Sequence, residues 1–268
     1  MTATGRLSTS SPNFQNIPIR TEDGKEIRKA IKAQSNDYQI FSADYSQVEL
    51  RVMAHLSGDA SLISALNNGE DIHTFTAKNI FNVDNDDMVL PEMRRIAKIV
   101  NFGIMYGAGP FRLSQELDIP FGEAKQIKDA YFEKYQGIEQ YIENSKLQIK
   151  ETKSVETLLG RKRAVWDSDS QNKIRRDAAE RMAINMPIQG TAAEMIKLAM
   201  IKIHRQINKE NLKSKLIMQI HDELLLEVHQ DEIDYISKMV IEHMRDAMKL
   251  DVPIEIDFGV GPSWYEAH

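Results

Sequence analysis

Apolar and polar positions along the chain follow two different spacings, which together predict a mixed fold. Residues 38–44 form a short, mostly apolar run that predicts a strand ending at Asp44. Residues 215–228 predict two strands folded back at His221-Asp222, and residues 254–260 predict a last strand. Between these strands, apolar residues recur at the helical spacing. The predicted fold class is therefore α+β.

Start and stop signals locate the predicted helices. Pro91 suits the first turn of a helix that runs to about residue 106 and stops at Gly107 and Gly109. Pro187 separates two predicted helices, because proline lacks the amide hydrogen that a helix interior needs. Further helices are predicted after Ser46 and at 60–67, 71–81 and 231–250, and residues 121–153 form a polar, amphipathic stretch. A hairpin is predicted at 155–166 and an extended loop at 1–19.

Composition narrows the class of protein. The chain has 268 residues, 42% of them hydrophobic, which is enough for one or two domains. It has no apolar run long enough to span a bilayer and no amino-terminal signal, so we expect a cytoplasmic protein without a membrane partner. Cysteine is absent, so a bound metal ion would need oxygen or histidine ligands.

The charge balance alone does not indicate a nucleic-acid partner. The net charge is −6, whereas a basic domain is the usual footprint of nucleic-acid binding. Positive residues nevertheless cluster at 94–98, 161–163 and 173–181. Such clusters are most often solvated surface, so they permit a nucleic-acid partner without establishing one.

Two carboxylates stand at predicted strand ends. Asp44 ends the strand at 38–44, and Asp222 lies in the predicted hairpin turn. An aspartate in such a place is usually only a turn former. Together the two could hold two Mg²⁺ ions, which prefer carboxylate oxygens. A two-metal site of this kind stabilises both the attacking and the leaving oxygen in phosphoryl transfer.

The helix that begins at Pro91 carries a complementary strip. Arg94, Lys98, Phe102 and Tyr106 are four residues apart and share one helix face. Cations neutralise phosphate, and a flat ring stacks on any base. On the helix alone, an amphipathic helix with a basic stripe is the more ordinary interpretation.

Three signatures in order resemble family A DNA polymerases of the bacterial DNA polymerase I type. The first is Asp44-Tyr45-Ser46-Gln47-Val48-Glu49-Leu50-Arg51. The second is Arg94-Arg95-x-x-Lys98-x-x-x-Phe102-Gly103-x-x-Tyr106-Gly107, and the third is Gln219-Ile220-His221-Asp222-Glu223. The flanks Thr2-Ala3-Thr4-Gly5-Arg6-Leu7-Ser8 and Asn16-Ile17-Pro18 are also similar to the family. The resemblance covers nearly the whole chain.

The resemblance implies an antiparallel-sheet palm with a large helical fingers insertion. Residues 1–56 would form the first part of the palm, 57–186 the fingers and 187–268 the second part of the palm. The family's thumb and exonuclease domains would be absent, so we expect a weaker grip on DNA and a thumb supplied separately as a partner.

The resemblance also implies a role for each site residue. Asp44, Asp222 and the Tyr45 carbonyl would bind two Mg²⁺ ions, for which Mn²⁺ can substitute, with Glu223 close by. Lys98 would also protonate the leaving pyrophosphate. The deoxynucleoside triphosphate would contact Gln47, Glu49, His73, Arg94, Lys98, Phe102 and Tyr106. Primer–template DNA would contact Arg6, Gln15, Asn16, Arg181, Asn185, Gln189 and His221.

These roles predict a template-directed DNA polymerase core in the cytoplasm, associated with the nucleoid, or in the host cytoplasm if the source is viral. The alternative is an inactive or thumb-dependent fragment that acts as a nucleic-acid-binding or subunit-binding module. A metal-dependent nuclease could use the same carboxylates, but it gives no reason for the strip from Arg94 to Tyr106.

Overall fold

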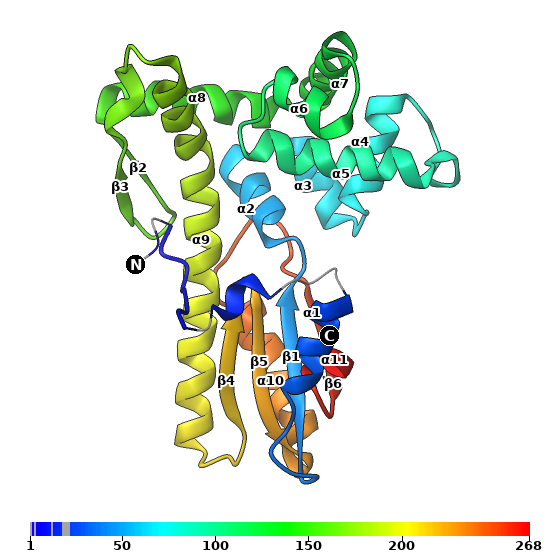
Figure 1. Cartoon of the computed structure of the whole chain (residues 1–268), viewed down its shortest axis with the longest axis vertical. Helices are drawn as coiled ribbons and strands as arrows, with labels where there is room; N and C mark the ends of the chain where they lie inside the picture. The colour runs from blue at the N-terminus through cyan, green and yellow to red at the C-terminus, as the bar shows by residue number, and fades with distance from the viewer. Residues whose placement is uncertain (1, 3, 12, 18–21) are drawn as a thin grey trace. The chain divides into compact units, whose positions relative to one another are not determined.

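The computed structural model describes residues 2, 4–11, 13–17 and 22–268 (Figure 1). The chain divides into two compact units. Unit 1 comprises residues 1–48, 190–249 and 254–268, and unit 2 comprises residues 49–189 and 250–253. The palm and fingers boundaries expected after residues 56 and 186 stay a prediction.

Unit 1 is built on a four-stranded antiparallel sheet, as the sequence predicted. Its strands are β1 (Tyr38–Tyr45), β4 (Lys215–Ile220), β5 (Glu223–His229) and β6 (Ile256–Gly261), in the order β4-β5-β1-β6. Strand β1 is central, and residues 40–43 are all buried, which is typical of a strand covered on both faces. Helix α10 (Ile233–Arg245) packs against the sheet. Near β6, α1 (Glu22–Ala30), which the sequence did not predict, packs against α11 (Trp264–Ala267).

The strand register places three carboxylates beside one another. Asp44 lies opposite Glu223 on β5 and opposite Asp257 on β6. Directly opposed residues of antiparallel strands project from the same face of a sheet. The end of β1 therefore concentrates negative charge on one face.

Unit 2 is mostly helical. The chain enters it in α2 (Val48–Ser57) and continues through α3 (Ala60–Asn67), α4 (Ile72–Phe81), α5 (Pro91–Met105), α6 (Pro110–Leu117), α7 (Phe121–Lys134) and α8 (Gln136–Thr152). The hairpin β2 (Ser154–Glu156) and β3 (Lys162–Ala164) follows. Helix α4 packs along α5, and α6 packs against α7. Across the described residues, no helix is both long and apolar enough to cross a membrane.

The expected break at Pro187 was wrong. One helix, α9, runs from Lys173 to Lys209 through the proline. An internal proline costs about 3 kcal/mol because it removes a hydrogen bond and crowds the preceding turn. However, Ile184, Met186 and Ile188 on either side of it are all buried, and each such side chain contributes about 1.5–3 kcal/mol. Packing therefore keeps the helix continuous.

A close backbone approach joins the start of α3 to the start of α8. Asp59 caps α3 by accepting a hydrogen bond from the Leu62 amide at 2.9 Å. Its other carboxylate oxygen accepts from the Gly137 amide at 2.8 Å. A Cβ atom at Gly137 would lie 2.7 Å from the Asp59 Cα. Glycine is therefore required where α8 begins.

We predict that Gly137→Ala lowers the free energy of unfolding by about 1–3 kcal/mol, because the methyl group would force backbone apart. Urea unfolding followed by circular dichroism measures this. The matched control is Gly122→Ala, also at the second position of its helix, where a Cβ would meet nothing within 4 Å. It should be neutral or stabilising by up to about 1 kcal/mol. Equal effects of the two substitutions would contradict the assigned contact.

Candidate active site

The carboxylates of unit 1 meet at a tight turn. Strands β4 and β5 are joined by His221 and Asp222 alone, and His221 has the positive φ of 52° that side chains rarely adopt. The Tyr45 amide donates to the Asp222 carbonyl oxygen at 3.2 Å. This bond ties the turn to the end of β1, so Asp222 is held beside the strand that carries Asp44.

The charge on this cluster is unfavourable without a cation. Burial raises the pKa of Asp44 to about 7, and the negative charges of Glu223 and Asp222 contribute to the shift. A divalent cation beside Asp44 and Asp222 would relieve that repulsion, and Mg²⁺ prefers carboxylate and carbonyl oxygens. Among the described residues, no group of three or more His, Asp or Glu side chains is placed to hold a metal ion. A metal ion at this site would therefore depend on Asp44, Asp222 and the Tyr45 backbone carbonyl as its protein ligands.

Glu223 is bound by three donors from unit 1. Its Oε1 accepts from the Ser42 hydroxyl at 2.5 Å, from the Trp264 indole at 2.7 Å and from the His268 ring at 3.3 Å. Burial alone would raise the pKa of Glu223, but these hydrogen bonds lower it. Glu223 is thus an ionised carboxylate whose Oε1 is already occupied by the protein.

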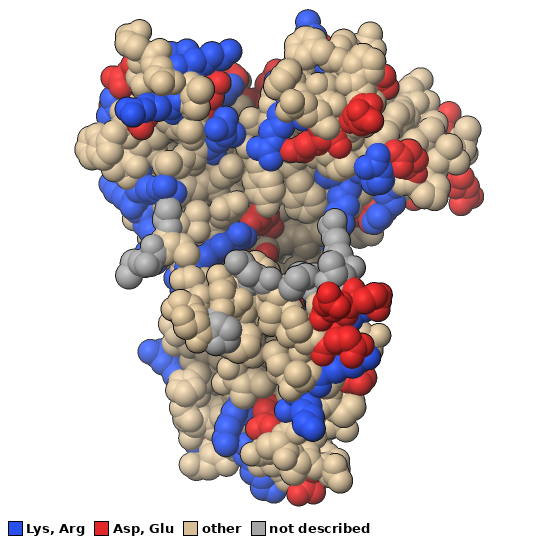
Figure 2. Space-filling view, in the orientation of Figure 1, with Lys and Arg blue, Asp and Glu red and all other residues tan. Residues whose placement is uncertain are grey.

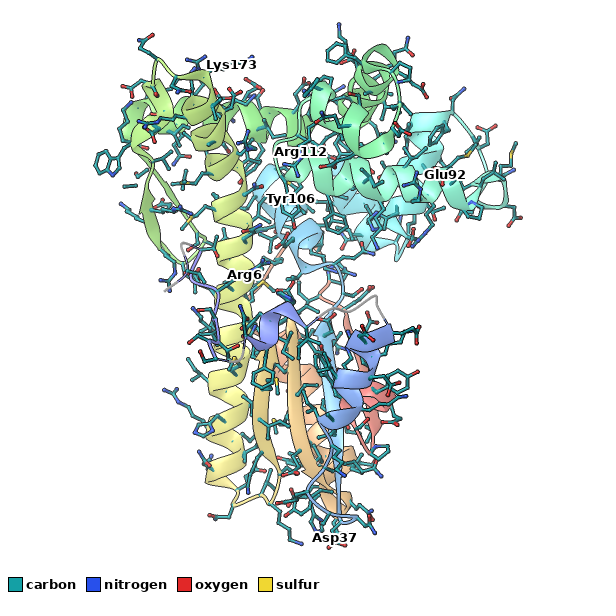
Figure 3. All side chains as sticks on the ribbon, viewed as in Figure 1. Arg6, Asp37, Glu92, Tyr106, Arg112 and Lys173 are labelled. Atoms are coloured by element: carbon teal, nitrogen blue, oxygen red, sulfur yellow. The ribbon has the colours of Figure 1, made fainter. Side chains whose placement is uncertain are left out.

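Helix α5 presents the predicted strip in unit 2. Arg94 and Lys98 are exposed, whereas Phe102 and Tyr106 are half-buried. The two rings are stacked, with centroids 6.3 Å apart and planes inclined by 26°. Tyr106 follows the last residue of the helix (Figure 3). The structure therefore brings two cations and two aromatic rings onto one helix.

Asp71 joins α4 to this strip. It accepts two hydrogen bonds from Arg94, at 3.1 Å and 2.7 Å, and caps α4 through the Thr74 amide at 2.7 Å. Partial burial opposes ionisation, but these bonds lower the pKa of Asp71 to about 2. His73 follows on α4, and its ring lies 5.7 Å from that of Phe102. Arg94, His73 and Phe102 are therefore neighbours.

Glu49 and Tyr106 are also brought together. The Tyr106 hydroxyl donates to Glu49 Oε2 at 2.5 Å, which connects α2 to the end of α5. Gln47 precedes α2 in unit 1 with a positive φ of 51°. The hydrogen bond makes the position of Tyr106 depend on the position of Glu49.

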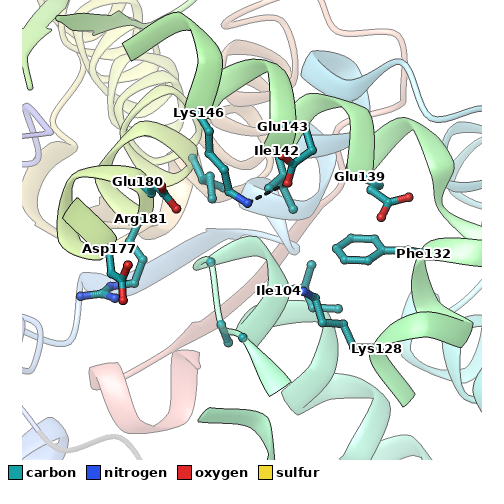
Figure 4. Close-up of a pocket in the computed structure, with 14 residues that line it drawn as sticks. Ile104, Lys128, Phe132, Glu139, Ile142, Glu143, Lys146, Asp177, Glu180 and Arg181 are labelled. Atoms are coloured by element: carbon teal, nitrogen blue, oxygen red, sulfur yellow. Dashed lines mark hydrogen bonds and ion pairs between the residues drawn. The ribbon is translucent and has the colours of Figure 1, made fainter. Parts of the chain in front are cut away.

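Arg181 lies on the wall of a cavity in unit 2 (Figure 4). The cavity has a volume of about 290 Å³ and is bordered by the end of α5 and by α7, α8 and α9. Gly107 has a φ of 73°, and a Cβ there would lie 3.0 Å from Arg181 Cγ. Asn185 and Gln189 are half-buried one and two turns further along α9. The structure thus places these three predicted DNA-contacting residues along one helix.

The remaining predicted DNA contacts lie in unit 1. Gln15 accepts from the Thr9 amide at 2.8 Å and donates to the Gln219 carbonyl at 3.3 Å, which ties the amino-terminal segment to β4. Arg6 is half-buried and His221 is exposed. Asn16 ends a short 3₁₀ helix, and its side chain lies outside the described residues.

Basic residues gather on one part of unit 2. Figure 2 shows Lys and Arg side chains over the β2–β3 hairpin and the start of α9. They are Arg161, Lys162, Arg163, Lys173, Arg175 and Arg176. Acidic side chains lie among them in the same view, so this part of the surface permits an anionic partner without establishing one.

Four residues of these clusters were missed by the sequence analysis. Ser42 could have been found, because residues two apart on a strand share a face and Ser42 precedes Asp44 by two. Asp71 carried the signal of a helix N-cap before His73. Trp264 and His268 reach Glu223 from the far end of the chain, and no local pattern marks them.

The fold combines an antiparallel sheet, with carboxylates at one strand end, and a helical insertion with a cationic and aromatic strip. This combination defines the palm-and-fingers class of fold. The model for DNA polymerase family A matches residues 1–266, and the chain belongs to that family. It is 48% identical over 267 residues to DNA polymerase I of Bacillus subtilis and 48% identical over 266 residues to the thermostable DNA polymerase I of Thermus filiformis. These matches cover 100% and 99% of this chain, but only 30% and 32% of those proteins.

A solved structure agrees closely. The POL domain of Pol1 from M. smegmatis, in complex with DNA primer-template and dNTP, matches with a TM-score of 0.95 and 46% identity. The match covers 100% of this chain and 47% of that one. The likeness therefore extends over the sheet and the helical insertion alike.

We predict that His73 makes the protein acid-sensitive. Burial lowers its pKa from 6.5 to about 4, so the unfolded chain binds a proton at a higher pH than the folded chain does. Stability from neutral His73 is therefore lost as pH falls from about 6.5 towards 4. Between pH 7 and pH 5 the loss should be about 1–2 kcal/mol. Urea unfolding of the wild type and His73→Gln at both pH values measures it, and parallel losses would refute the assignment.

Proposed function

We propose that this chain is the catalytic core of a template-directed DNA polymerase that adds deoxynucleotides to a primer 3′ end. The observation that carries the proposal is the pair formed by Asp44 near the end of β1 and Asp222 in the adjoining turn, in a chain that matches a structure bound to primer-template and dNTP. Unit 1 supplies the carboxylates and unit 2 supplies the nucleotide-binding strip. The reaction needs both.

Asp44, Asp222 and the Tyr45 carbonyl would hold two Mg²⁺ ions, with Mn²⁺ as a substitute. When bound, such ions neutralise phosphate charge and activate the primer hydroxyl for in-line attack. Glu223 would act close by rather than as a direct ligand, because its Oε1 accepts from Ser42, Trp264 and His268. The cation-binding carboxylates of this proposal are therefore Asp44 and Asp222.

The incoming triphosphate would bind Arg94, Lys98 and His73, with Gln47 beside them. The Arg94 pair with Asp71 is partly exposed, and such pairs contribute only about 0–1 kcal/mol. A triphosphate, with more charge than one carboxylate, can therefore replace Asp71 as the partner of Arg94. Lys98 would donate a proton to the departing pyrophosphate.

Phe102 would pack on the nucleotide, and Tyr106 would occupy the template-base position until that base arrives. Glu49 would lie under the sugar and exclude a 2′-hydroxyl, which selects deoxynucleotides. Because Phe102 has no hydroxyl, unlike a tyrosine at this position, we expect the protein to incorporate dideoxynucleotides poorly.

Primer–template DNA would lie along residues that contact backbone phosphates and the minor groove. The minor groove presents similar acceptors for every base pair, so such contacts test pair geometry without reading sequence. These residues are Arg6, Gln15, Asn16, Arg181, Asn185, Gln189 and His221.

The alternative remains a nucleic-acid-binding or subunit-binding module that depends on a thumb supplied separately. It is kept because the chain spans about 30% of the length of the curated relatives it matches. We propose the cytoplasm, in association with the nucleoid, as the place of action.

We predict that Asp222→Ala abolishes single-nucleotide primer extension in Mg²⁺ at low salt. Loss of one cation-holding carboxylate should cost several kcal/mol in the transition state, or at least about a hundredfold in rate. The matched control is Asp37→Ala, an exposed aspartate just before the other end of β1 (Figure 3). It should keep the wild-type rate.

Three other results would each change the conclusion. Extension only after a thumb domain is added would favour the thumb-dependent module. Asp222-dependent degradation of the primer without extension would indicate a nuclease. Extension that survives in Asp222→Ala would remove Asp222 from the site.

A further inference from the structure

Four polar side chains form a buried chain of hydrogen bonds in unit 2. His73 and Thr76 lie on α4, Asn101 lies on α5, and Tyr135 follows α7. Each is 2% exposed or less. Buried polar groups cost free energy unless they are hydrogen-bonded, so partners fix their orientation. Nothing in the sequence marks Asn101, which precedes Phe102 in an otherwise apolar stretch.

The amide nitrogen of Asn101 faces the His73 ring. Asn101 Nδ2 lies 3.1 Å from His73 Nδ1, and the Thr76 hydroxyl lies 3.2 Å from Asn101 Oδ1. Tyr135 is 2.8 Å from the same hydroxyl and can donate to it. An amide nitrogen only donates, so His73 Nδ1 must accept and carries no hydrogen. The proton of the neutral ring is therefore on Nε2.

The surroundings keep the ring neutral. Burial opposes a charge on His73, and Arg94 and Lys98 oppose it further, whereas Asp71 favours it. Because Nδ1 is engaged by Asn101, Nε2 is the ring nitrogen left to meet a ligand. The tautomer then decides the interaction: Nε2–H donates to an anionic oxygen, whereas a bare Nε2 lone pair would repel it.

We propose that Asn101 is a positioning residue that holds His73 as the Nε2–H tautomer and thereby presents a neutral donor to a phosphate oxygen of the incoming nucleotide. The inference rests on the proposed function in taking a deoxynucleoside triphosphate as the ligand. It adds a residue and a proton position to that site. The Thr76 hydroxyl holds the Asn101 amide in place, at 3.2 Å from Oδ1 and 3.1 Å from Nδ2, and Tyr135 bonds to the same hydroxyl.

The tautomer is tested directly by nitrogen-15 NMR of the full chain labelled at histidine. We expect His73 to show an unprotonated Nδ1 and a protonated Nε2 at pH 7. In Asn101→Asp, whose carboxylate can only accept, the proton should move to Nδ1. A wild-type ring protonated at Nδ1 would overturn the proposal, and this measurement needs no variant to fold.

Nucleotide affinity tests the consequence. With dTTP and Mg²⁺ in calorimetry, Asn101→Asp should bind about tenfold more weakly or worse, since a hydrogen bond to a charged group is lost. Asn79→Asp adds the same charge on α4, where Asn79 donates to the Phe75 carbonyl at 2.6 Å, and should bind like the wild type. In a His73→Gln background, Asn101→Asp should have little further effect, which a purely structural role would not produce.

Equal weakening by Asn79→Asp and Asn101→Asp, or additive effects in the double variant, would overturn the proposal. The proposed polymerase function fails separately. If the tautomer and the dTTP results hold but no protein extends a primer, the positioning role stands and the catalytic conclusion falls.

Discussion

The repulsion among carboxylates at the end of β1 is the constraint on which unit 1 depends. Antiparallel pairing places Asp44 opposite Glu223, and the tight turn adds Asp222 next to it. Hydrogen bonds from Ser42, Trp264 and His268 to one Glu223 oxygen stabilise the charge of that carboxylate. The charge of Asp44 is not stabilised in this way, and its pKa rises to about 7. A proton or a cation beside Asp44 would relieve this repulsion, so the proposed affinity for a cation would follow from the register of the sheet.

Unit 2 carries the positive charge of Arg94 and pairs it within the unit. Arg94 is exposed yet tethered to Asp71, and Asp71 also caps the helix that carries His73. One carboxylate thus orients a cation and fixes the start of α4. Because an exposed ion pair contributes little, the proposed transfer of Arg94 from Asp71 to a phosphate would cost little free energy. In the proposed complex, Asp71 would stay near the triphosphate. A neutral His73 can bind a phosphate oxygen there only if its proton is on Nε2.

Local signals in the sequence predicted the parts of the fold that local chemistry determines. Pro91 and Gly107 bracket α5, and the two-residue turn at His221-Asp222 was found from the strands on either side. Pro187 misled the prediction because its cost is local, whereas the buried side chains that offset it belong to the packed structure. Asn101, Trp264 and His268 act through partners 28 to 45 positions away, so spacing along the chain could not connect them with the site.

The hydrogen bond between Tyr106 and Glu49 would couple the two roles proposed for these residues, at the template-base position and under the sugar. Glu49 is buried, and the Tyr106 hydroxyl donates to it at 2.5 Å. If a template base displaces Tyr106, Glu49 loses that donor while remaining in a poorly hydrated place. A buried carboxylate that loses a donor is destabilised until another takes its position. The steric barrier to a 2′-hydroxyl and the vacating of the template position would then be linked through one hydrogen bond rather than arranged independently.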